Sequence, residues 1–236
     1  MTSDALGQDA TLYLAREAHR CGDFAAALEH YDYFFEHALD GDPYALYGVR
    51  LSYCLDEWAE LGQQFPLATD RLRLKKESAL RQLKSSRDPE RFHDYIAICQ
   101  YLKCSDEPIQ QFLAYHRSDR DLSGSIVRFI WNDLVDAKEW DVCGSYIDDS
   151  EERYRNTLGR FDEAMSVCDS DPNLGGEEFA AQIEGWYVRD VRNLVLVLRN
   201  VARAAEAEEI LVQVKDDCTE RGRLGMLERI CEQLVL

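Results

Sequence analysis

The 236-residue chain is 46% hydrophobic and 11% aromatic, with only 5 prolines and 13 glycines, which excludes a disordered or low-complexity protein. Its 45 acidic and 27 basic side chains give a formal net charge of −18, which disfavours direct nucleic-acid binding because phosphate recognition depends on Lys and Arg. A basic protein surface is the better partner on electrostatic grounds, and the alternative is that the charge serves solubility alone.

The clearest pattern covers residues 10–43, where two helices are hinged at Gly22-Asp23 and closed by Asp42-Pro43. Apolar residues recur there at three- and four-residue steps, the period of a helix and not of a strand. Gly22 can adopt the left-handed conformation that ends a helix, and Asp23 can accept the free amides that begin the next one. The segment therefore predicts one helical hairpin.

Apolar residues continue at helical spacing after Pro43, so helices are expected along the rest of the chain. Polar stretches and Gly, Pro or Asp signals separate each helix from the next. A helix over 140–168 is either continuous or broken at Asp148-Asp149. The expected helices cover Pro43 to Gly62, 66–83, Asp88-Pro89 to Leu102, Ser105 to Leu113, 122–137, 140 onward and 177–200, with two closing segments over 204–214 and 224–234.

Together these elements predict an all-α fold of about ten or eleven helices in one domain over residues 1–236. The clearest loop is Asn173 to Gly176, so a subdivision, if there is one, is expected at 173–176.

One segment of the acidic chain is strongly basic: residues 71–87, which begin within the helix expected over 66–83 and which we call the basic island. We interpret its basic side chains as an exposed face paired with neighbouring acids, with anion binding as the alternative. Whether the island lies in a groove is left open.

Three segments share a motif. Residues 22–31 (GDFAAALEHY), followed by Asp42-Pro43, resemble the tetratricopeptide repeat, in which helix pairs stack into a superhelix. Residues 158–165 (LGRFDEAM) and 58–65 (WAELGQQF) are further, partial echoes of that repeat. The resemblance implies helical hairpins at these places and, for the whole chain, an irregular right-handed superhelix of antiparallel helix pairs that binds a protein or peptide.

Patterns for catalysis or cofactor binding are not found in the sequence. A phosphate-binding loop, a Gly-x-Ser-x-Gly elbow and a His-Glu-x-x-His motif are all absent from it. His30 and His37 lie two helical turns apart, about 10 Å, too far for one metal ion. The 8 cysteines form no Cys-x-x-Cys pair and are interpreted as small buried hydrophobic residues. No cofactor, metal ion or catalytic residue is therefore expected.

The first ten residues contain neither a basic segment nor an apolar run, so no secretory signal is expected. No stretch approaches the roughly 20 apolar residues that span a bilayer. These features predict a cytoplasmic protein that does not contact a membrane, in a compartment where cysteines stay reduced.

Aromatic residues beside charges are the candidates for binding, since Tyr, Trp and Arg anchor protein interfaces. Their helical spacing places them on a groove lined by the first, third and fifth expected helices, and the alternative is that they pack between repeats. The candidate partner-binding residues are Tyr13, Arg16, Tyr44, Tyr47, Arg50, Glu57, Tyr95, Trp186 and Arg189.

The sequence thus favours a non-catalytic helical-repeat scaffold or adaptor that holds a basic protein or peptide on an acidic surface. A bacterial immunity protein that neutralises a basic toxin domain is a narrower alternative. An enzyme that uses either His93, Asp94 and Tyr95 or the pair His30 and His37 in a cleft is an alternative from another class. Self-assembly through the terminal apolar helix is a further alternative. The oligomeric state, monomer or homodimer, is left open.

Overall fold

The computed structural model describes residues 8–42, 44–170 and 176–235, and every regular element among them is an α-helix. These ranges hold thirteen helices, more than the ten or eleven expected, because residues 44–62 and 140–168 each contribute to two. None of these helices is both long enough and apolar enough to cross a membrane. The helices are α1 (Gln8–Cys21), α2 (Phe24–His37), α3 (Tyr47–Leu51), α4 (Tyr53–Gln64), α5 (Pro66–Ser86), α6 (Glu90–Tyr101), α7 (Asp106–Ser118), α8 (Arg120–Asp136), α9 (Trp140–Gly144), α10 (Ser150–Ser170), α11 (Glu177–Asn200), α12 (Ala204–Glu220) and α13 (Leu224–Val235).

The chain divides into two compact units, residues 1–130 and 131–236. Their boundary lies within α8. The single domain over residues 1–236 stays a prediction. The subdivision expected at 173–176 also stays a prediction, because residues 173–175 lie outside the described part of the chain.

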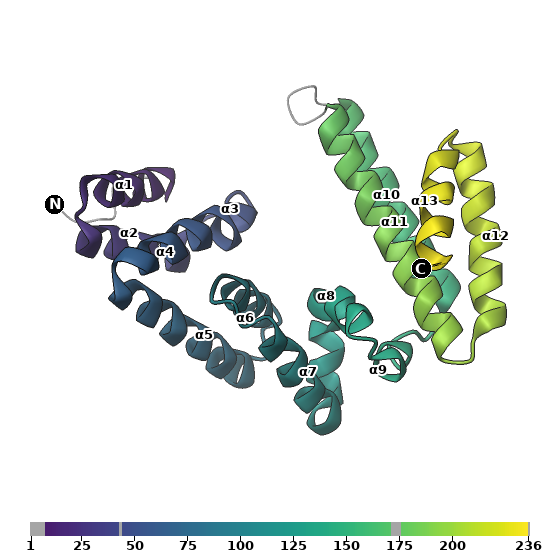
Figure 1. Cartoon of the computed structure of the whole chain (residues 1–236), viewed down its shortest axis with the longest axis horizontal. Helices are drawn as coiled ribbons and strands as arrows, with labels where there is room; N and C mark the ends of the chain where they lie inside the picture. The colour runs from purple at the N-terminus through teal and green to yellow at the C-terminus, as the bar shows by residue number, and fades with distance from the viewer. Residues whose placement is uncertain (1–7, 43, 171–175, 236) are drawn as a thin grey trace. The chain divides into compact units, whose positions relative to one another are not determined.

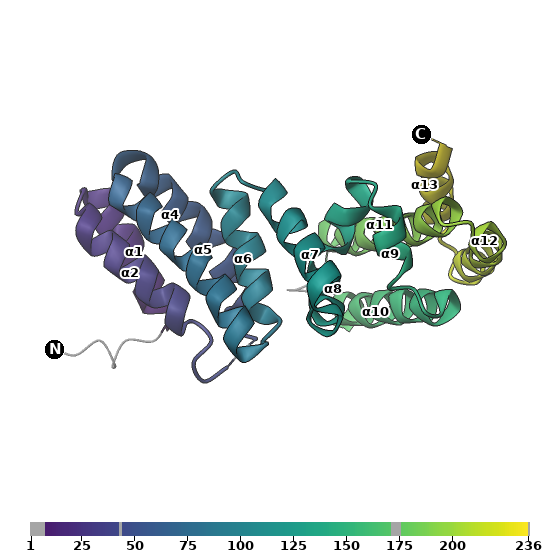
Figure 2. The same ribbon diagram turned by 90° about the horizontal axis from the view of Figure 1, so that it is seen from below.

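In the first unit, α1 and α2 form the hairpin that the sequence predicts. Gly22 has a φ of +79°, the left-handed conformation that ends α1. The Asp23 side chain accepts the backbone N–H of Ala26 at 3.2 Å and so begins α2. The next helices pack in chain order, α2 against α4, α4 against α5 and α5 against α6 (Figures 1 and 2). This unit is therefore built of helix pairs laid side by side.

The contact between α4 and α5 is close because of one glycine. A Cβ atom added at Gly62 would lie 2.3 Å from the Thr69 hydroxyl oxygen. Beside this contact, Trp58 is fully buried and its indole N–H donates to the carbonyl of Ala68 at 3.1 Å. Residues 58–64, which are all but the last residue of one repeat-like segment, thus lie in a helix that packs tightly on its successor.

The helix expected from Pro43 to Gly62 is not continuous, which corrects that prediction. A turn over residues 44–46 precedes α3, and Ser52 separates α3 from α4 with a φ of −116° and a ψ of −87°. Both the hydroxyl and the backbone N–H of Ser52 donate to the carbonyl of Gly48, at 2.7 and 3.0 Å. A serine that bonds local backbone in this way competes with regular helix geometry.

In the second unit α11 is central, since it packs against α9, α10, α12 and α13. A polar chain also joins three of these helices, because the Tyr154 hydroxyl lies 3.0 Å from that of Tyr187 and donates to Asp217 at 2.8 Å. The apolar residues whose spacing predicts a helix over 177–200 form one row on α11. Phe179 is partly buried, and the other members are fully buried at Ile183, Tyr187, Val191, Leu194 and Leu198.

The segment 140–168 is broken, so of the two alternatives left open by the sequence the break is realised. The Asp149 side chain accepts a backbone N–H of the first turn of α10 at 2.9 Å and acts as its cap. Arg203 donates to the carbonyl of Ile147 at 2.6 Å and so holds the residues that connect α9 to α10. The cap and this contact together separate α9 from α10.

Residues 158–165 do not form the hairpin turn that their likeness to the tetratricopeptide repeat implies. They lie within the continuous helix α10, and Gly159 is exposed with open space around its Cα. The turn at Gly22 has a left-handed glycine, whereas Gly159 is not among the residues with positive φ. The motif alone therefore does not determine where a hairpin closes.

Replacing Gly159 by alanine is expected to stabilise the second unit by about 0.5–1 kcal/mol, because glycine inside a helix loses more backbone entropy than alanine. Urea unfolding followed by circular dichroism measures the change. As a matched control, Gly144→Ala should destabilise the same unit, since its Cβ would lie 2.8 Å from a Val201 methyl carbon. A loss of stability for Gly159→Ala would mean that residue 159 sits in a turn.

Candidate functional site

Two of the candidate partner-binding residues, Arg16 and Glu57, lie in contact although they belong to different helices. The Arg16 guanidinium of α1 donates two hydrogen bonds to the Glu57 carboxylate of α4, at 2.8 and 2.9 Å. The buried Tyr31 hydroxyl donates to the same carboxylate at 3.3 Å, and burial raises the pKa of this tyrosine. Glu57 is therefore a fixed anion with two donors.

Two exposed tyrosines flank this ion pair. Tyr13 lies one turn before Arg16 on α1 and is 60% exposed, while Tyr53 lies one turn before Glu57 on α4 and is 63% exposed. Tyr53 was not among the candidate partner-binding residues, because it was expected to be one of the buried residues of its helix. Its spacing of four from Glu57 was the signal that could have indicated it.

The same side of α4 also carries Asp56 and Glu60, both exposed. Tyr53, Asp56, Glu57 and Glu60 follow a spacing of three and four residues and so share one helical stripe. We call this surface, Tyr13 and Arg16 of α1 with these four residues of α4, the α1–α4 face.

Arg50 lies away from this face, which corrects the expectation of an exposed stripe through Tyr44, Tyr47, Arg50 and Glu57. Arg50 is 4% exposed and forms a salt bridge with Asp94 of α6, with N–O distances of 2.5 and 2.9 Å. Tyr44, in contrast, is 86% exposed in the turn before α3. The break at Ser52 changes the helical phase between α3 and α4, so a spacing counted through it does not define one face.

Tyr47 is partly buried and lies among polar side chains of α6. Its hydroxyl contacts the Glu90 carboxylate and lies 2.5 Å from His93 Nδ1. The His93 ring stacks on Phe129 with centroids 4.7 Å apart, and burial lowers the pKa of this histidine. This contact connects α3 to α6 inside the unit.

The three consecutive residues proposed for an enzyme do not form one constellation. His93 contacts Tyr47, Asp94 contacts Arg50, and Tyr95 contacts Glu107 of α7. Neighbours on a helix point about 100° apart, which explains these three separate directions.

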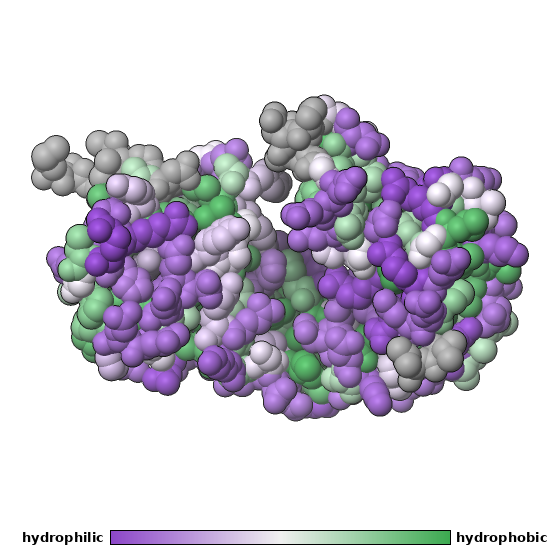
Figure 3. Space-filling model, turned by 45° about the horizontal axis from the view of Figure 1, so that its top comes forward, coloured by the Kyte–Doolittle hydropathy of each residue, from purple (hydrophilic) through white to green (hydrophobic). Residues whose placement is uncertain are grey.

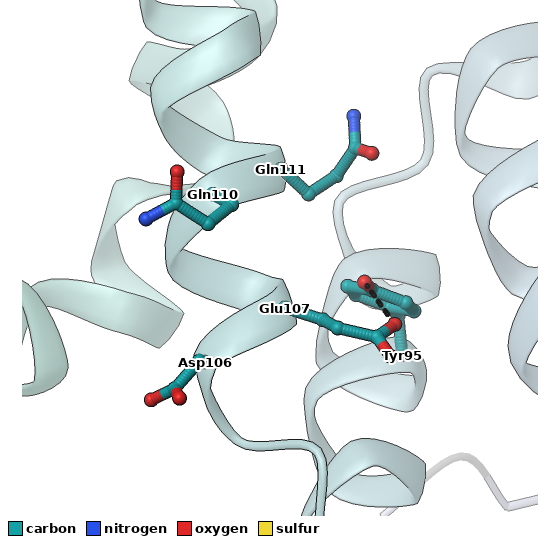
Figure 4. Close-up of a pocket in the computed structure, with 5 residues that line it drawn as sticks. All are labelled: Tyr95, Asp106, Glu107, Gln110 and Gln111. Atoms are coloured by element: carbon teal, nitrogen blue, oxygen red, sulfur yellow. Dashed lines mark hydrogen bonds between the residues drawn. The ribbon is translucent and has the colours of Figure 1, made fainter.

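A different cluster lies where α6 meets α7. Tyr95 is 2% exposed, and its hydroxyl donates to Glu107 at 3.5 Å. Lys76 of α5 donates to the same carboxylate at 2.7 Å. Figure 4 shows Glu107 and Tyr95 directed toward one another while Asp106 points away. They border a pocket of about 390 Å³ lined by Tyr95, Asp106, Glu107, Gln110 and Gln111.

Two cysteines complete this cluster. One ligand atom each from Cys99, Cys104 and Glu107 lie within 4.8 Å of one another, the one such group of metal-ligating side chains in the described ranges. The Lys76 ammonium lies 3.8 Å from the Cys104 sulfur. We call Lys76, Tyr95, Cys99, Cys104 and Glu107 the α6–α7 cluster. Its spacing in the sequence is Cys-x4-Cys-x2-Glu, which differs from the Cys-x-x-Cys pattern and so gave no metal-site prediction.

Most basic side chains of the island at 71–87 are paired with acids, either within α5 or in other parts of the first unit. Lys75 lies 2.5 Å from Asp32 of α2, and Arg87 forms two hydrogen bonds with Asp119 at 2.7 and 3.0 Å. Arg71 also contacts Asp32. These ion pairs favour the interpretation of a paired, exposed face over that of an anion site.

Trp186 and Arg189 belong to α11 in the second unit. Trp186 is 48% exposed, and the Arg189 guanidinium lies 3.5 Å from Asp190.

The negative charge is unevenly divided between the two units. Residues 131–236 hold 24 acidic and 12 basic side chains, so the second unit carries the larger share of the negative charge. Hydrophilic residues cover much of the face shown in Figure 3, and hydrophobic residues gather in smaller patches.

Comparisons with known proteins found nothing similar. No model of a protein family, no curated protein and no solved structure matched the chain. The α1–α4 face and the α6–α7 cluster are therefore the features from which a function can be inferred.

Proposed function

We propose that the chain is a non-catalytic helical-repeat scaffold, similar to tetratricopeptide-repeat proteins, that binds a basic segment of another protein. The observation that carries this proposal is the α1–α4 face, where two exposed tyrosines lie beside a row of carboxylates. Tyrosine provides a large, rigid contact area with a directional hydroxyl, and such residues carry much of the binding energy at interfaces.

The packing of the first unit supports the repeat-like part of this proposal. α1 with α2 and α4 with α5 are consecutive helix pairs, and α2 packs on α4 to join them. Gly62 and Trp58 produce a close contact inside the second pair. Stacked pairs of this kind extend as a superhelix whose first helices share one face, and α1 and α4 are the first helices of their pairs.

The charges of the face favour a basic partner. α4 contains Asp56, Glu57 and Glu60 and no Lys or Arg. Arg16, the cation within the face, is already paired with Glu57. Asp56 and Glu60 take part in no ion pair among the described residues. Two exposed carboxylates beside two tyrosines are suited to Lys or Arg side chains, through ion pairs and cation–π contacts.

Affinity capture on the full chain tests this proposal. A lysate of the source cells is passed over the protein at low and high salt, and each retained polypeptide is identified and its Kd measured in purified form. We expect a basic protein that is released at high salt, because exposed charges are screened over about 10 Å at 0.1 M salt. Retention of no protein at either salt concentration would contradict the proposal.

Matched variants locate the binding surface. Tyr53→Ala, and Asp56→Lys combined with Glu60→Lys, should each weaken binding by roughly tenfold or more, as expected for anchor residues. The control is Glu151→Lys combined with Glu152→Lys in α10, which makes the same charge change at exposed positions of the second unit. Equal weakening by the control would show that only net charge matters and that the α1–α4 face is not the site.

A further inference from the structure

The turn between α6 and α7 brings two cysteines together. Lys103 has a φ of +57°, and the backbone N–H of Cys104 donates to the carbonyl of Cys99 at 2.9 Å. The N–H of Lys103 donates to the carbonyl of Gln100 at 3.1 Å. These two bonds define a Schellman motif, in which the side chains at the positions of Cys99 and Cys104 meet.

The third member of the group comes from the start of α7. Glu107 lies three residues after Cys104, within the first turn of α7. Its carboxylate and the two sulfurs all lie within 4.8 Å of one another. In tetrahedral zinc sites the ligand atoms are roughly 3.5–3.8 Å apart, as follows from Zn–S and Zn–O bonds of about 2.3 and 2.1 Å. Small side-chain rotations within this turn therefore suffice to place the three atoms around one ion.

A cation already occupies part of this space. The Lys76 ammonium lies 2.7 Å from the Glu107 carboxylate and 3.8 Å from the Cys104 sulfur. The Lys76 side chain is only 18% exposed, so the ammonium is held against these groups by the surrounding helices. The cluster thus already holds one positive charge beside the Glu107 carboxylate and the Cys104 sulfur.

We propose that Cys99, Cys104 and Glu107 bind a zinc ion in place of the Lys76 ammonium. Thiolate ligands favour Zn²⁺ over Mg²⁺ or Ca²⁺, and two cysteines separated by four residues match the spacing of zinc-binding turns. Three protein ligands leave a fourth tetrahedral position. That position is filled by water or by a small molecule from the adjoining pocket of about 390 Å³.

This proposal is independent of the α1–α4 face and changes the interpretation of two cysteines. Cys99 is fully buried, and burial raises the pKa of its thiol. Zinc would displace the thiol protons, so binding is coupled to proton release. The other cysteines do not share a ligand group with a third side chain in the described part of the chain.

Metal titration of the full chain, kept reduced by a phosphine, tests the proposal. Zinc is added in competition with a chromophoric chelator, and cobalt is added as a spectroscopic probe. We expect one zinc ion per chain, and for cobalt the charge-transfer absorption of bound thiolates together with the visible bands of a tetrahedral ion. No binding above that of an unrelated acidic protein would overturn the proposal.

Variants identify the ligands. Cys104→Ser should abolish stoichiometric binding and the cobalt–thiolate absorption, and Glu107→Gln should weaken binding without removing that absorption. Glu107 is exposed, so this second variant tests the site even if Cys104→Ser is unstable. Cys21→Ser and Cys231→Ser, at exposed cysteines elsewhere, are the controls. Unchanged binding in Cys104→Ser, or its loss in the controls, would place the metal elsewhere and contradict the proposal.

Replacing Lys76 should change zinc affinity in the direction opposite to replacing a ligand. Lys76→Met removes the competing ammonium while keeping the aliphatic stem, so zinc binding should tighten by roughly tenfold or more, given the strength of charge interactions at this distance. A ligand substitution and a competitor substitution that act in opposite directions cannot both result from general destabilisation. Weaker zinc binding in Lys76→Met would show that the ammonium supports the site and would refute its role as a competitor.

Discussion

Asp94→Ala is expected to lower the free energy of unfolding of the first unit by about 3–5 kcal/mol, because it leaves the buried Arg50 charge without its counterion. The two side chains are 5% and 4% exposed. Arg50 also donates to the carbonyl of Phe35 at 2.6 Å and lies 3.9 Å over its ring. It therefore cannot turn to water without breaking this part of the core. Urea unfolding at neutral pH measures the change.

A matched exposed pair provides the control for this prediction. Asp70 lies 2.8 Å from Arg73, but both side chains are about 60% exposed, so Asp70→Ala should cost less than about 1 kcal/mol. Replacing Arg50 and Asp94 together, by Met and Leu, should recover most of the loss, since it removes both buried charges at once. If Asp94→Ala costs no more than Asp70→Ala, the Arg50–Asp94 bridge does not contribute as described.

Trp58→Ala should destabilise the same unit by about 3–5 kcal/mol, the cost of a large cavity in a close-packed core. The indole is fully buried, meets Phe35 edge-to-face at 6.3 Å and satisfies the carbonyl of Ala68. Its removal loses the apolar contacts and the hydrogen bond from the indole to that carbonyl. The stability is measured by urea unfolding followed by circular dichroism.

Tyr53→Ala is the control for Trp58→Ala, since it removes a large aromatic side chain from the exposed side of the same helix. It should change stability by about 0.5 kcal/mol or less. The result also establishes that a loss of partner binding in Tyr53→Ala does not come from unfolding. If both variants destabilise equally, Trp58 is not at the centre of the α4–α5 contact.

Local signals in the sequence were sufficient for much of the fold. Gly22 and Asp23 fixed the first hinge because both act within one or two residues of where they stand. The apolar row of α11 was recognised for a similar reason, since its spacing alone defines a face. The bounds of that helix, 177–200, match the prediction.

Features that depend on distant partners could not be predicted in this way. Arg50 was expected on a groove because its partner, Asp94, lies 44 residues away in the sequence. The meeting of Cys99 and Cys104 depends on a left-handed conformation at Lys103, a residue type that rarely adopts it. Gly159 and Gly22 have similar neighbours in the sequence, but only Gly22 has a positive φ. The neighbouring residues therefore did not predict the backbone conformation at Gly159.

The central position of α11 affects how the second unit can open. α9, α10, α12 and α13 all pack on this one helix, so α11 stays covered by the other three when any one of them moves away. The backbone amides of α11 can reach water only when several neighbours have left it, so its local opening approaches the unfolding of the whole unit. In the first unit each helix depends mainly on those next to it in the chain. There, motion can begin at an end helix and spread inward one helix at a time.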